Sequence, residues 1–217
     1  MARMSKAALW DLDGTIVDSE EYHWHAWRET CAAEGVSITY GQFRETFGWR
    51  DDDIVPKLMP GVDPARVAEL GEAKEAAYRR MVREKGLDPL PGVVDTLRRL
   101  HDHGWLQAVA SSAPRENIRV VLEVTGLDRT FDAIVSAEDV RIGKPDPEVF
   151  LKAAMRLGVA PERCVVVEDA PAGIEGARRA GMKSVGVGSG RDLSAADIAV
   201  PSLKHLPDDA LEKLVGQ

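Results

Sequence analysis

The sequence predicts an α/β protein with a doubly wound parallel sheet and an inserted small α-helical cap domain. Short apolar runs alternate with helical patterns from about residue 90 onward, and a first apolar run stands alone near the N-terminus. Near-continuous apolar runs are typical of strands buried on both faces of a parallel sheet. Between the first and second runs lies a stretch without a strand-like pattern, which predicts the helical insertion.

Five apolar runs are expected to form the strands, and they occupy residues 6–13, 106–112, 132–136, 163–169 and 183–188. Helical patterns cover residues 91–103, 114–125, 146–158 and 171–180. Proline suits the first turn of a helix and glycine suits the position just past its end. Pro147 and Pro171 therefore fit two helix starts, and Gly158 and Gly181 fit the ends of the same two helices.

Residues 19–88 differ from the rest of the chain. Aromatic and apolar residues recur at helical spacing in 19–34, and 64–86 form one long charged helical pattern. The charged run 72–85 is expected to be a solvated helix face. The segment LDPLPG at 87–92 has the composition of a linker. We therefore expect two domains, a sheet core of residues 1–18 and 89–217 and a helical cap of residues 19–88.

Composition and charge exclude several classes of partner. The 217 residues carry a formal net charge of −8 at pH 7, so the surface repels phosphate backbones and nucleic acid is not an expected partner. No apolar stretch approaches the length of a membrane span, and Asp11 and Asp13 interrupt the basic N-terminus before a signal-peptide core can form. Cys31 and Cys164 match no metal or redox spacing. We expect a cytoplasmic monomer with reduced thiols and no membrane partner.

Acidic residues follow two of the predicted strands. Asp11 and Asp13 close the first run, and Glu168 and Asp169 close the fourth. Ligands of open α/β sheets bind beyond the carboxyl ends of the strands. Carboxylates that converge there cannot all stay ionised without compensation, and a divalent cation with oxygen ligands, such as Mg2+, supplies it. The sequence therefore predicts a divalent-cation site at this edge of the sheet.

The same edge collects the groups that phosphoryl transfer needs. Asp11 is expected to act as a metal ligand and a nucleophile, because carboxylates form covalent phosphoryl intermediates. Asp13 is expected to protonate the leaving oxygen and then to activate water, and Gly14 permits the tight turn that aims both carboxylates. Ser111 is expected to hold phosphate oxygens, and Lys144 to neutralise charge on the transferring group.

Four segments together resemble the haloacid dehalogenase-like superfamily of phosphotransferases. DLDGT (11–15) resembles its first motif, ASS around Ser111 its second, GKPDP (143–147) its third and VVEDAPAGIEGARRAGM (166–182) its fourth. The segments stand in the order of the family and span nearly the whole chain. The resemblance implies a Rossmann-like core with a helical cap inserted after the first strand.

The resemblance also implies a role for each matched residue. Asp11 would be the nucleophile and Asp13 the general acid and base. Ser111 and Lys144 would bind the transferring phosphoryl group. The implied Mg2+ ligands are the Asp11 side chain, the Asp13 backbone carbonyl and Asp169, with Glu168 either a further ligand or a neighbour that supports them.

Within the superfamily, DSEEYHWHAW (18–27) and the EDAPAGI stretch are most similar to the group that contains beta-phosphoglucomutase and related phosphatases. His23 falls where that mutase has a histidine. The KGxSR cap motif of the mutase is absent, since Phe47 stands where its lysine would be. His23 could instead be a histidine packed on an aromatic helix face, and Arg50 could instead form a surface ion pair. Both alternatives to substrate binding remain open. The residues expected to contact substrate are Ser112, His23, Trp49 and Arg50.

The leading hypothesis is an enzyme, a Mg2+-dependent phosphatase that hydrolyses a small phosphorylated metabolite, such as a sugar phosphate, through an aspartyl-phosphate. The first alternative is a beta-phosphoglucomutase-type mutase, which returns the phosphoryl group to the substrate instead of to water. The second is a non-enzymatic phosphoacceptor domain. The position of Asp13 and the cap-sized insertion argue against the second alternative, and the sequence leaves the substrate unidentified.

Overall fold

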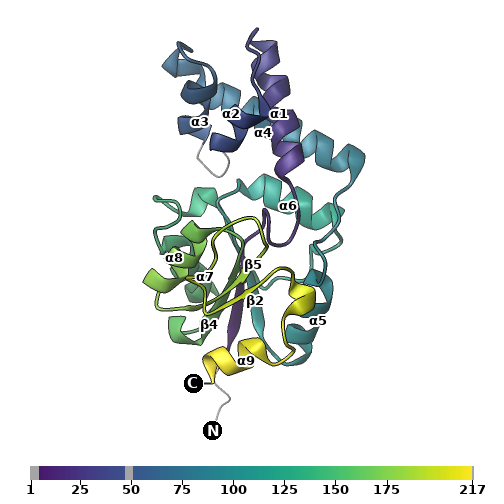
Figure 1. Cartoon of the computed structure of the whole chain (residues 1–217), viewed down its shortest axis with the longest axis vertical. Coiled ribbons are helices and arrows are strands. Elements are labelled where there is room, and N and C mark those ends of the chain that lie inside the picture. Colours follow the sequence, from purple (N-terminus) through teal and green to yellow (C-terminus); the bar gives the residue numbers. More distant parts are fainter. Residues whose placement is uncertain (1–4, 47–50, 217) are drawn as a thin grey trace. The chain divides into compact units, whose positions relative to one another are not determined.

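The computed structural model describes residues 5–46 and 51–216, and six strands in these ranges form one parallel sheet in the order β3-β2-β1-β4-β5-β6 (Figure 1). The predicted doubly wound parallel sheet is confirmed. The sequence did not predict the sixth strand, a three-residue strand at one edge of the sheet. The strands are β1 (Ala7–Trp10), β2 (Leu106–Ala110), β3 (Ala133–Val135), β4 (Cys164–Glu168), β5 (Lys183–Val187) and β6 (Ile198–Val200).

The first strand, β1, lies in the middle of the sheet. Ala7 is paired with Leu106 of β2 on one side and with Cys164 of β4 on the other. All four residues of β1 are fully buried, which fits a strand without charged side chains. The indole Nε1 of Trp10 donates a hydrogen bond of 3.2 Å to Gln107 Oε1, so its one polar atom is satisfied within the core.

Helices cover the sheet on both sides. Figure 1 shows α7 (Glu148–Leu157) and α8 (Pro171–Arg179) on one side and α5 (Val93–Asp102) on the other. Two further helices, α6 (Arg115–Val124) and α9 (Ala210–Val215), complete this unit. Alternate residues of the central strands, among them Leu9 and Val166, form one apolar cluster with α7 and α8.

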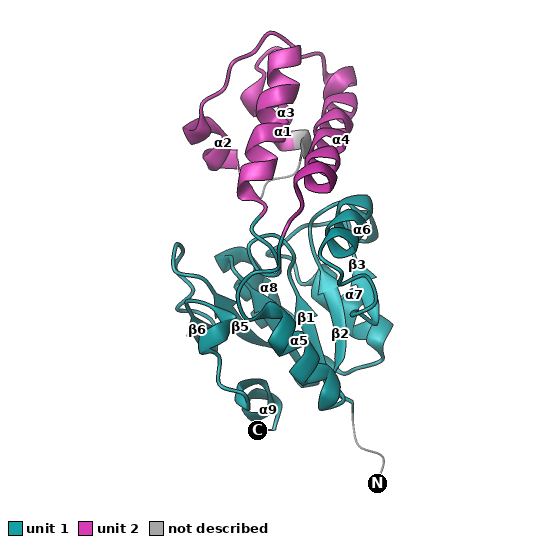
Figure 2. Cartoon of the chain, turned by 90° about the vertical axis from the view of Figure 1, so that its right-hand side faces the viewer, with its two compact units in different colours: residues 1–18, 88–217 teal, residues 19–87 magenta. Residues whose placement is uncertain are grey.

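Residue contacts divide the chain into two compact units, one of Met1–Asp18 with Asp88–Gln217 and one of Ser19–Leu87 (Figure 2). The second unit contains α1 (Glu20–Ala33), α2 (Tyr40–Thr46), α3 (Asp51–Leu58) and α4 (Val67–Lys85). Its apolar core includes Trp27, Cys31, Phe43, Val55 and Leu70. No described helix of either unit is both long and apolar enough to cross a membrane.

The sequence predicted that the charged run 72–85 forms a solvated helix face. The structure contradicts this prediction for two residues of the run. Lys74 and Glu75 are only 3% and 5% exposed, and the Lys74 ammonium lies 2.7 Å from Glu75 Oε1. Lys74 also lies 5.2 Å from the centre of the Trp27 ring. The prediction failed because a charge pattern does not reveal which charges neutralise each other inside a helical unit.

The two segments that join the sheet core to the helical insertion run side by side. Val17 forms an antiparallel bridge with Pro89, and Leu90 donates a hydrogen bond of 2.7 Å to the carbonyl of Ile16. Just upstream, Gly14 has a φ of 88° and donates a hydrogen bond of 2.7 Å to Val17, which closes the turn after β1. This turn fixes the place where the chain leaves the sheet.

We expect Gly92→Ala to lower the free energy of unfolding by about 3 kcal/mol, as measured by urea denaturation. Gly92 caps α5 with a φ of 92°, and a Cβ there would lie 2.5 Å from the backbone nitrogen of Lys204. Gly104→Ala is the matched control, because Gly104 has a φ of 73° but open space around its Cα. The control should lose only about 1 kcal/mol, the cost of the left-handed backbone alone. Equal losses would show that the close approach to Lys204 has no energetic weight.

Candidate active site

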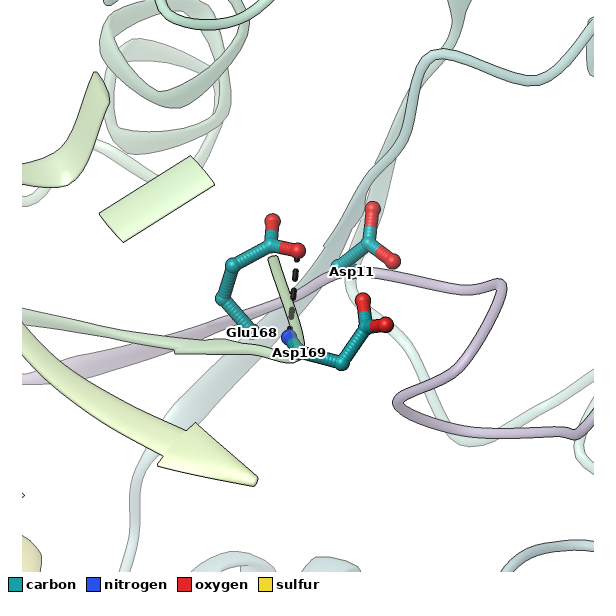
Figure 3. Close-up of side chains that lie close together, drawn as sticks. All are labelled: Asp11, Glu168 and Asp169. Atoms are coloured by element: carbon teal, nitrogen blue, oxygen red, sulfur yellow. Dashed lines mark hydrogen bonds between the residues drawn. The ribbon is translucent and has the colours of Figure 1, made fainter. Parts of the chain in front are cut away.

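Three carboxylates meet at the carboxyl edge of the sheet (Figure 3). Asp11 directly follows β1, Glu168 is the last residue of β4 and Asp169 follows it. Since β1 and β4 are neighbouring parallel strands, the structure brings together acids that are more than 150 residues apart, and one oxygen of each lies within 4.8 Å of the others. Asp11 is 7% exposed and Glu168 is 1% exposed, so water screens their repulsion poorly.

Lys144 supplies the compensating charge for two of these acids. Its ammonium donates to Asp11 Oδ1 and, at 2.7 Å, to Glu168 Oε2. The residue lies in the loop before α7, its side chain is 10% exposed and the peptide bond to Pro145 is cis. The Phe150 ring lies 5.2 Å from the ammonium, a distance at which a cation and an aromatic face attract each other.

Glu168 has hydrogen-bond partners at both of its oxygens. Oε1 accepts from the backbone N–H groups of Asp169 and Ala170, each at 3.1 Å, and Oε2 accepts from Lys144. The side chain fits only because residue 173 is glycine, since a Cβ there would lie 2.0 Å from Oε2. In this structure Glu168 therefore orients Lys144 and the first turn of α8.

The Asp169 carboxylate lies close to two other segments of the chain. A Cβ on Gly14 would lie 2.3 Å from Asp169 Oδ2, so the glycine of the first turn also makes room for this acid. Arg191 Nη1 donates a hydrogen bond of 2.8 Å to the same oxygen. Arg191 lies in the loop between β5 and β6.

The electrostatics of the site follow from burial. Burial raises the pKa of Asp11 well above its usual value, and the charge of Glu168 adds to the rise. Burial likewise raises the pKa of Asp169 to about 7, with a further rise from Glu168. Burial opposes the charge of Lys144, but Asp11 and Glu168 outweigh it and raise the pKa of the ammonium, which stays charged at neutral pH.

The other predicted core residues lie on neighbouring segments. Asp13 is in the turn after β1 and is partly exposed. Ser111 directly follows β2, is 2% exposed and accepts a hydrogen bond of 3.0 Å from the Ala113 N–H at its hydroxyl. Ser112 is exposed. These positions do not test the acid–base role of Asp13 or phosphate binding by the two serines. Both roles stay predictions.

The predicted substrate contacts outside the sheet unit also stay predictions. His23 is on α1, where its ring stacks on Tyr78 with centroids 4.1 Å apart and an interplanar angle of 11°. This packing agrees with the structural alternative for His23. Trp49 and Arg50 lie outside the described residues.

Sequence reasoning missed three residues of the site: Phe150, Gly173 and Arg191. The loop after β5 begins at the same sheet edge as the acids, so the rule that pointed to Asp11 and Asp169 also applied to Arg191. Phe150 and Gly173 carry no such signal. Their roles depend on the side chains of Lys144 and Glu168, which a linear pattern does not place.

The donor set fits a hard divalent cation. The oxygens of Asp11, Glu168 and Asp169 are the ligand type that Mg2+ prefers. Glycine at position 14 keeps clear the space that a Cβ would take beside Asp169, so the carboxylate stands close to the backbone of the first turn. The backbone carbonyl of Asp13, which the family resemblance implies as a ligand, belongs to the same turn.

A doubly wound sheet with buried acids and a charged lysine at its carboxyl edge defines an α/β enzyme that acts on an anionic substrate. A family model described as haloacid dehalogenase-like hydrolase matches residues 8–187. The chain belongs to this family, and the resemblance inferred from the four motifs is confirmed.

Named relatives include both mutases and phosphatases. The chain is 33% identical to beta-phosphoglucomutase of Bacillus subtilis, over 96% of this chain and 94% of that protein. It is 36% identical to fructose-1-phosphate phosphatase YqaB of Escherichia coli, over 82% of this chain and 94% of that protein. The crystal structure of beta-phosphoglucomutase from Clostridium difficile matches with a TM-score of 0.86 and 28% identity, covering 98% of each chain.

The raised pKa of Asp169 predicts a pH dependence of stability in the metal-free protein. The folded carboxyl keeps its proton to about pH 7, whereas its usual pKa is 3.8, so the folded state binds more protons between these values and loses stability as pH rises. Asp169→Asn removes this loss. We take the free energy of unfolding of Asp169→Asn in EDTA and subtract that of wild type. This difference should rise by at least about 1 kcal/mol between pH 4 and pH 8.

Urea denaturation at several pH values measures this difference, and Asp197→Asn is a control of opposite sign. Lys183 and the Ser184 N–H outweigh burial and hold the pKa of Asp197 below its usual value. Asp197 therefore contributes stability above its unfolded pKa, and Asp197→Asn should lose stability relative to wild type as pH rises through the acidic range. A difference between Asp169→Asn and wild type that is constant with pH would contradict the raised pKa.

Proposed function

We propose that this protein is a Mg2+-dependent phosphatase that hydrolyses a small phosphorylated metabolite, of the sugar phosphate class, through a phosphoryl intermediate on Asp11. The observation that carries the proposal is the contact of Asp11 with Lys144 at the end of β1, beside the acids at the end of β4. This arrangement provides a buried nucleophile, a fixed cation and a set of oxygen ligands at one point.

In the first step, an Asp11 carboxylate oxygen attacks phosphorus, the bond from phosphorus to the ester oxygen breaks and Asp13 protonates the departing alkoxide. In the second step, Asp13 takes a proton from water, whose oxygen attacks phosphorus and releases inorganic phosphate. Asp11 returns as a carboxylate and Asp13 as an acid, so the cycle closes without another reagent.

Lys144 has two tasks in this scheme. Its charge lowers the cost of keeping Asp11 ionised, and the ammonium lies beside the carboxylate that would attack phosphorus. Glu168 fixes the ammonium from the other side, so the cation is oriented before substrate arrives. The Ser111 hydroxyl, at the end of the adjacent strand β2, would hold a phosphate oxygen.

Mg2+ would be held by Asp11, Asp169 and the Asp13 backbone carbonyl, with Glu168 supporting them or adding a ligand. When bound, the ion would offset the negative charge of the phosphate oxygens and of the crowded carboxylates. Burial of Asp11 and Asp169 supports this proposal, since ionised carboxylates in such surroundings need a neighbouring cation.

The substrate class is proposed from the relatives. Fructose-1-phosphate phosphatase of E. coli and hexitol phosphatase B of the same species are named for phosphorylated sugars or polyols, and they share 36% and 33% identity with the chain. A mutase is the second candidate, favoured by the similarity to beta-phosphoglucomutase. Phe47 in place of the mutase lysine favours hydrolysis.

Asp11→Asn should lower kcat by at least about a thousandfold, because the amide is not a nucleophile. Asp18→Asn, an exposed position in the same N-terminal segment, is the matched control and should keep wild-type turnover. Circular dichroism would show whether both variants fold. Near-wild-type hydrolysis by folded Asp11→Asn would exclude the aspartyl-phosphate, and a phosphoryl group that stays on wild-type Asp11 for hours would indicate a phosphoacceptor domain.

Product analysis separates the two enzyme candidates. We expect fructose 1-phosphate or beta-glucose 1-phosphate to yield inorganic phosphate in equal amount to the substrate consumed, and EDTA to stop the reaction until Mg2+ is restored. The measurement records phosphate and glucose 6-phosphate separately, with and without a bisphosphate primer. Formation of the 6-phosphate without net phosphate release would establish the mutase instead.

A further inference from the structure

The loop between β5 and β6 carries an arginine to the carboxylate cluster. Arg191 follows the turn that begins at Gly188, where φ is 127°, and its side chain is 35% exposed. Two contacts fix the loop just beyond it. Leu193 is buried with its Cβ 3.0 Å from where a Cβ on Gly186 would lie, and Asp192 Oδ1 accepts the N–H of Ser194 at 3.0 Å.

The guanidinium of Arg191 binds an acid that Lys144 does not reach with a hydrogen bond. Nη1 lies 2.8 Å from Asp169 Oδ2, while the ammonium of Lys144 donates to Asp11 and Glu168. The Asp169 side chain is 15% exposed, so the attraction is less screened than in a surface ion pair. Arg191 therefore places a permanent positive charge beside Asp169, which is a metal ligand in the proposed function.

We infer that Arg191 is a built-in counter-ion that competes with the divalent cation for Asp169 and so weakens the affinity of the site for metal. The inference rests on the proposed metal site. An entering cation either displaces the guanidinium from Asp169 or binds next to it and is repelled. Both effects lower the affinity, whichever oxygen of Asp169 faces the metal.

A purely orienting role for Arg191 makes the opposite prediction. If the ion pair mainly held Asp169 in a ligating orientation, loss of the guanidinium would free the carboxylate and weaken metal binding. Gly14 argues against this role, because the backbone of the turn after β1 already stands close to the same carboxylate without help from Arg191. The direction of the change in metal affinity therefore decides between competition and orientation.

The test measures binding of Mg2+, and of Mn2+ in its place, to the full chain by calorimetry without substrate. We expect Arg191→Ala to bind either ion about tenfold more tightly than wild type, which corresponds to about 1.4 kcal/mol. Arg191→Lys keeps the charge and should stay within about threefold of wild type. Arg129→Ala removes the same charge from an exposed site before β3 and should leave the affinity unchanged.

Amide hydrogen exchange provides a readout that does not depend on turnover. In wild type, a Mg2+ ion that displaces the guanidinium from Asp169 should speed exchange in residues 188–193. In Arg191→Ala this segment should exchange fast with or without metal. Unchanged or weaker metal binding by Arg191→Ala would overturn the inference while leaving the proposed function intact. Absence of metal binding by wild type would overturn the metal site itself.

Discussion

Lys144 bridges two carboxylates that come from different strands, Asp11 from β1 and Glu168 from β4, and the rest of the site depends on these contacts. Both acids are buried, and the ammonium supplies a positive charge that offsets the repulsion between them. Two other residues support this arrangement. Phe150 lies against the ammonium, and Gly173 leaves the space in which Glu168 reaches it. The Lys144 ammonium thus limits which residues can occupy the neighbouring positions.

The buried carboxylates of the site lower the stability of the folded chain. The pKa of Asp11 and that of Asp169 are both raised by burial, so at neutral pH the metal-free protein keeps carboxylates under conditions that favour their protonation. A bound cation or an added proton relieves this unfavourable energy. Stability and metal loading are therefore linked, as expected of a site arranged for reaction instead of for rigidity.

Much of the sheet and of the acidic centre was predictable from the sequence because both follow from short-range patterns. A strand such as AALW shows its burial in its own composition, and the end-of-strand rule then brings Asp11 near Asp169 without knowledge of any contact. The edge strand β6 was not predicted, although β3, which has the same length, was.

Burial and pairing of individual charges were not predictable. Lys74 and Glu75 stand in a run that reads as solvated, yet they neutralise each other inside the helical unit. The place of Phe150 likewise depends on packing between α7 and α8, since a Cβ on Gly176 would meet its ring at 3.0 Å. Such features are decided by the shape of neighbouring side chains, and a linear pattern does not contain that information.

The central place of β1 has a consequence for the order in which the chain can be assembled on a ribosome. Its hydrogen-bonding partners begin at Leu106 and Cys164, so the strand made first is completed on both sides only after three quarters of the chain has been synthesised. Ser19–Leu87, which has an apolar core of its own, emerges during that wait. The nascent chain therefore carries the apolar AALW segment without its neighbouring strands while the inserted helices have already been synthesised.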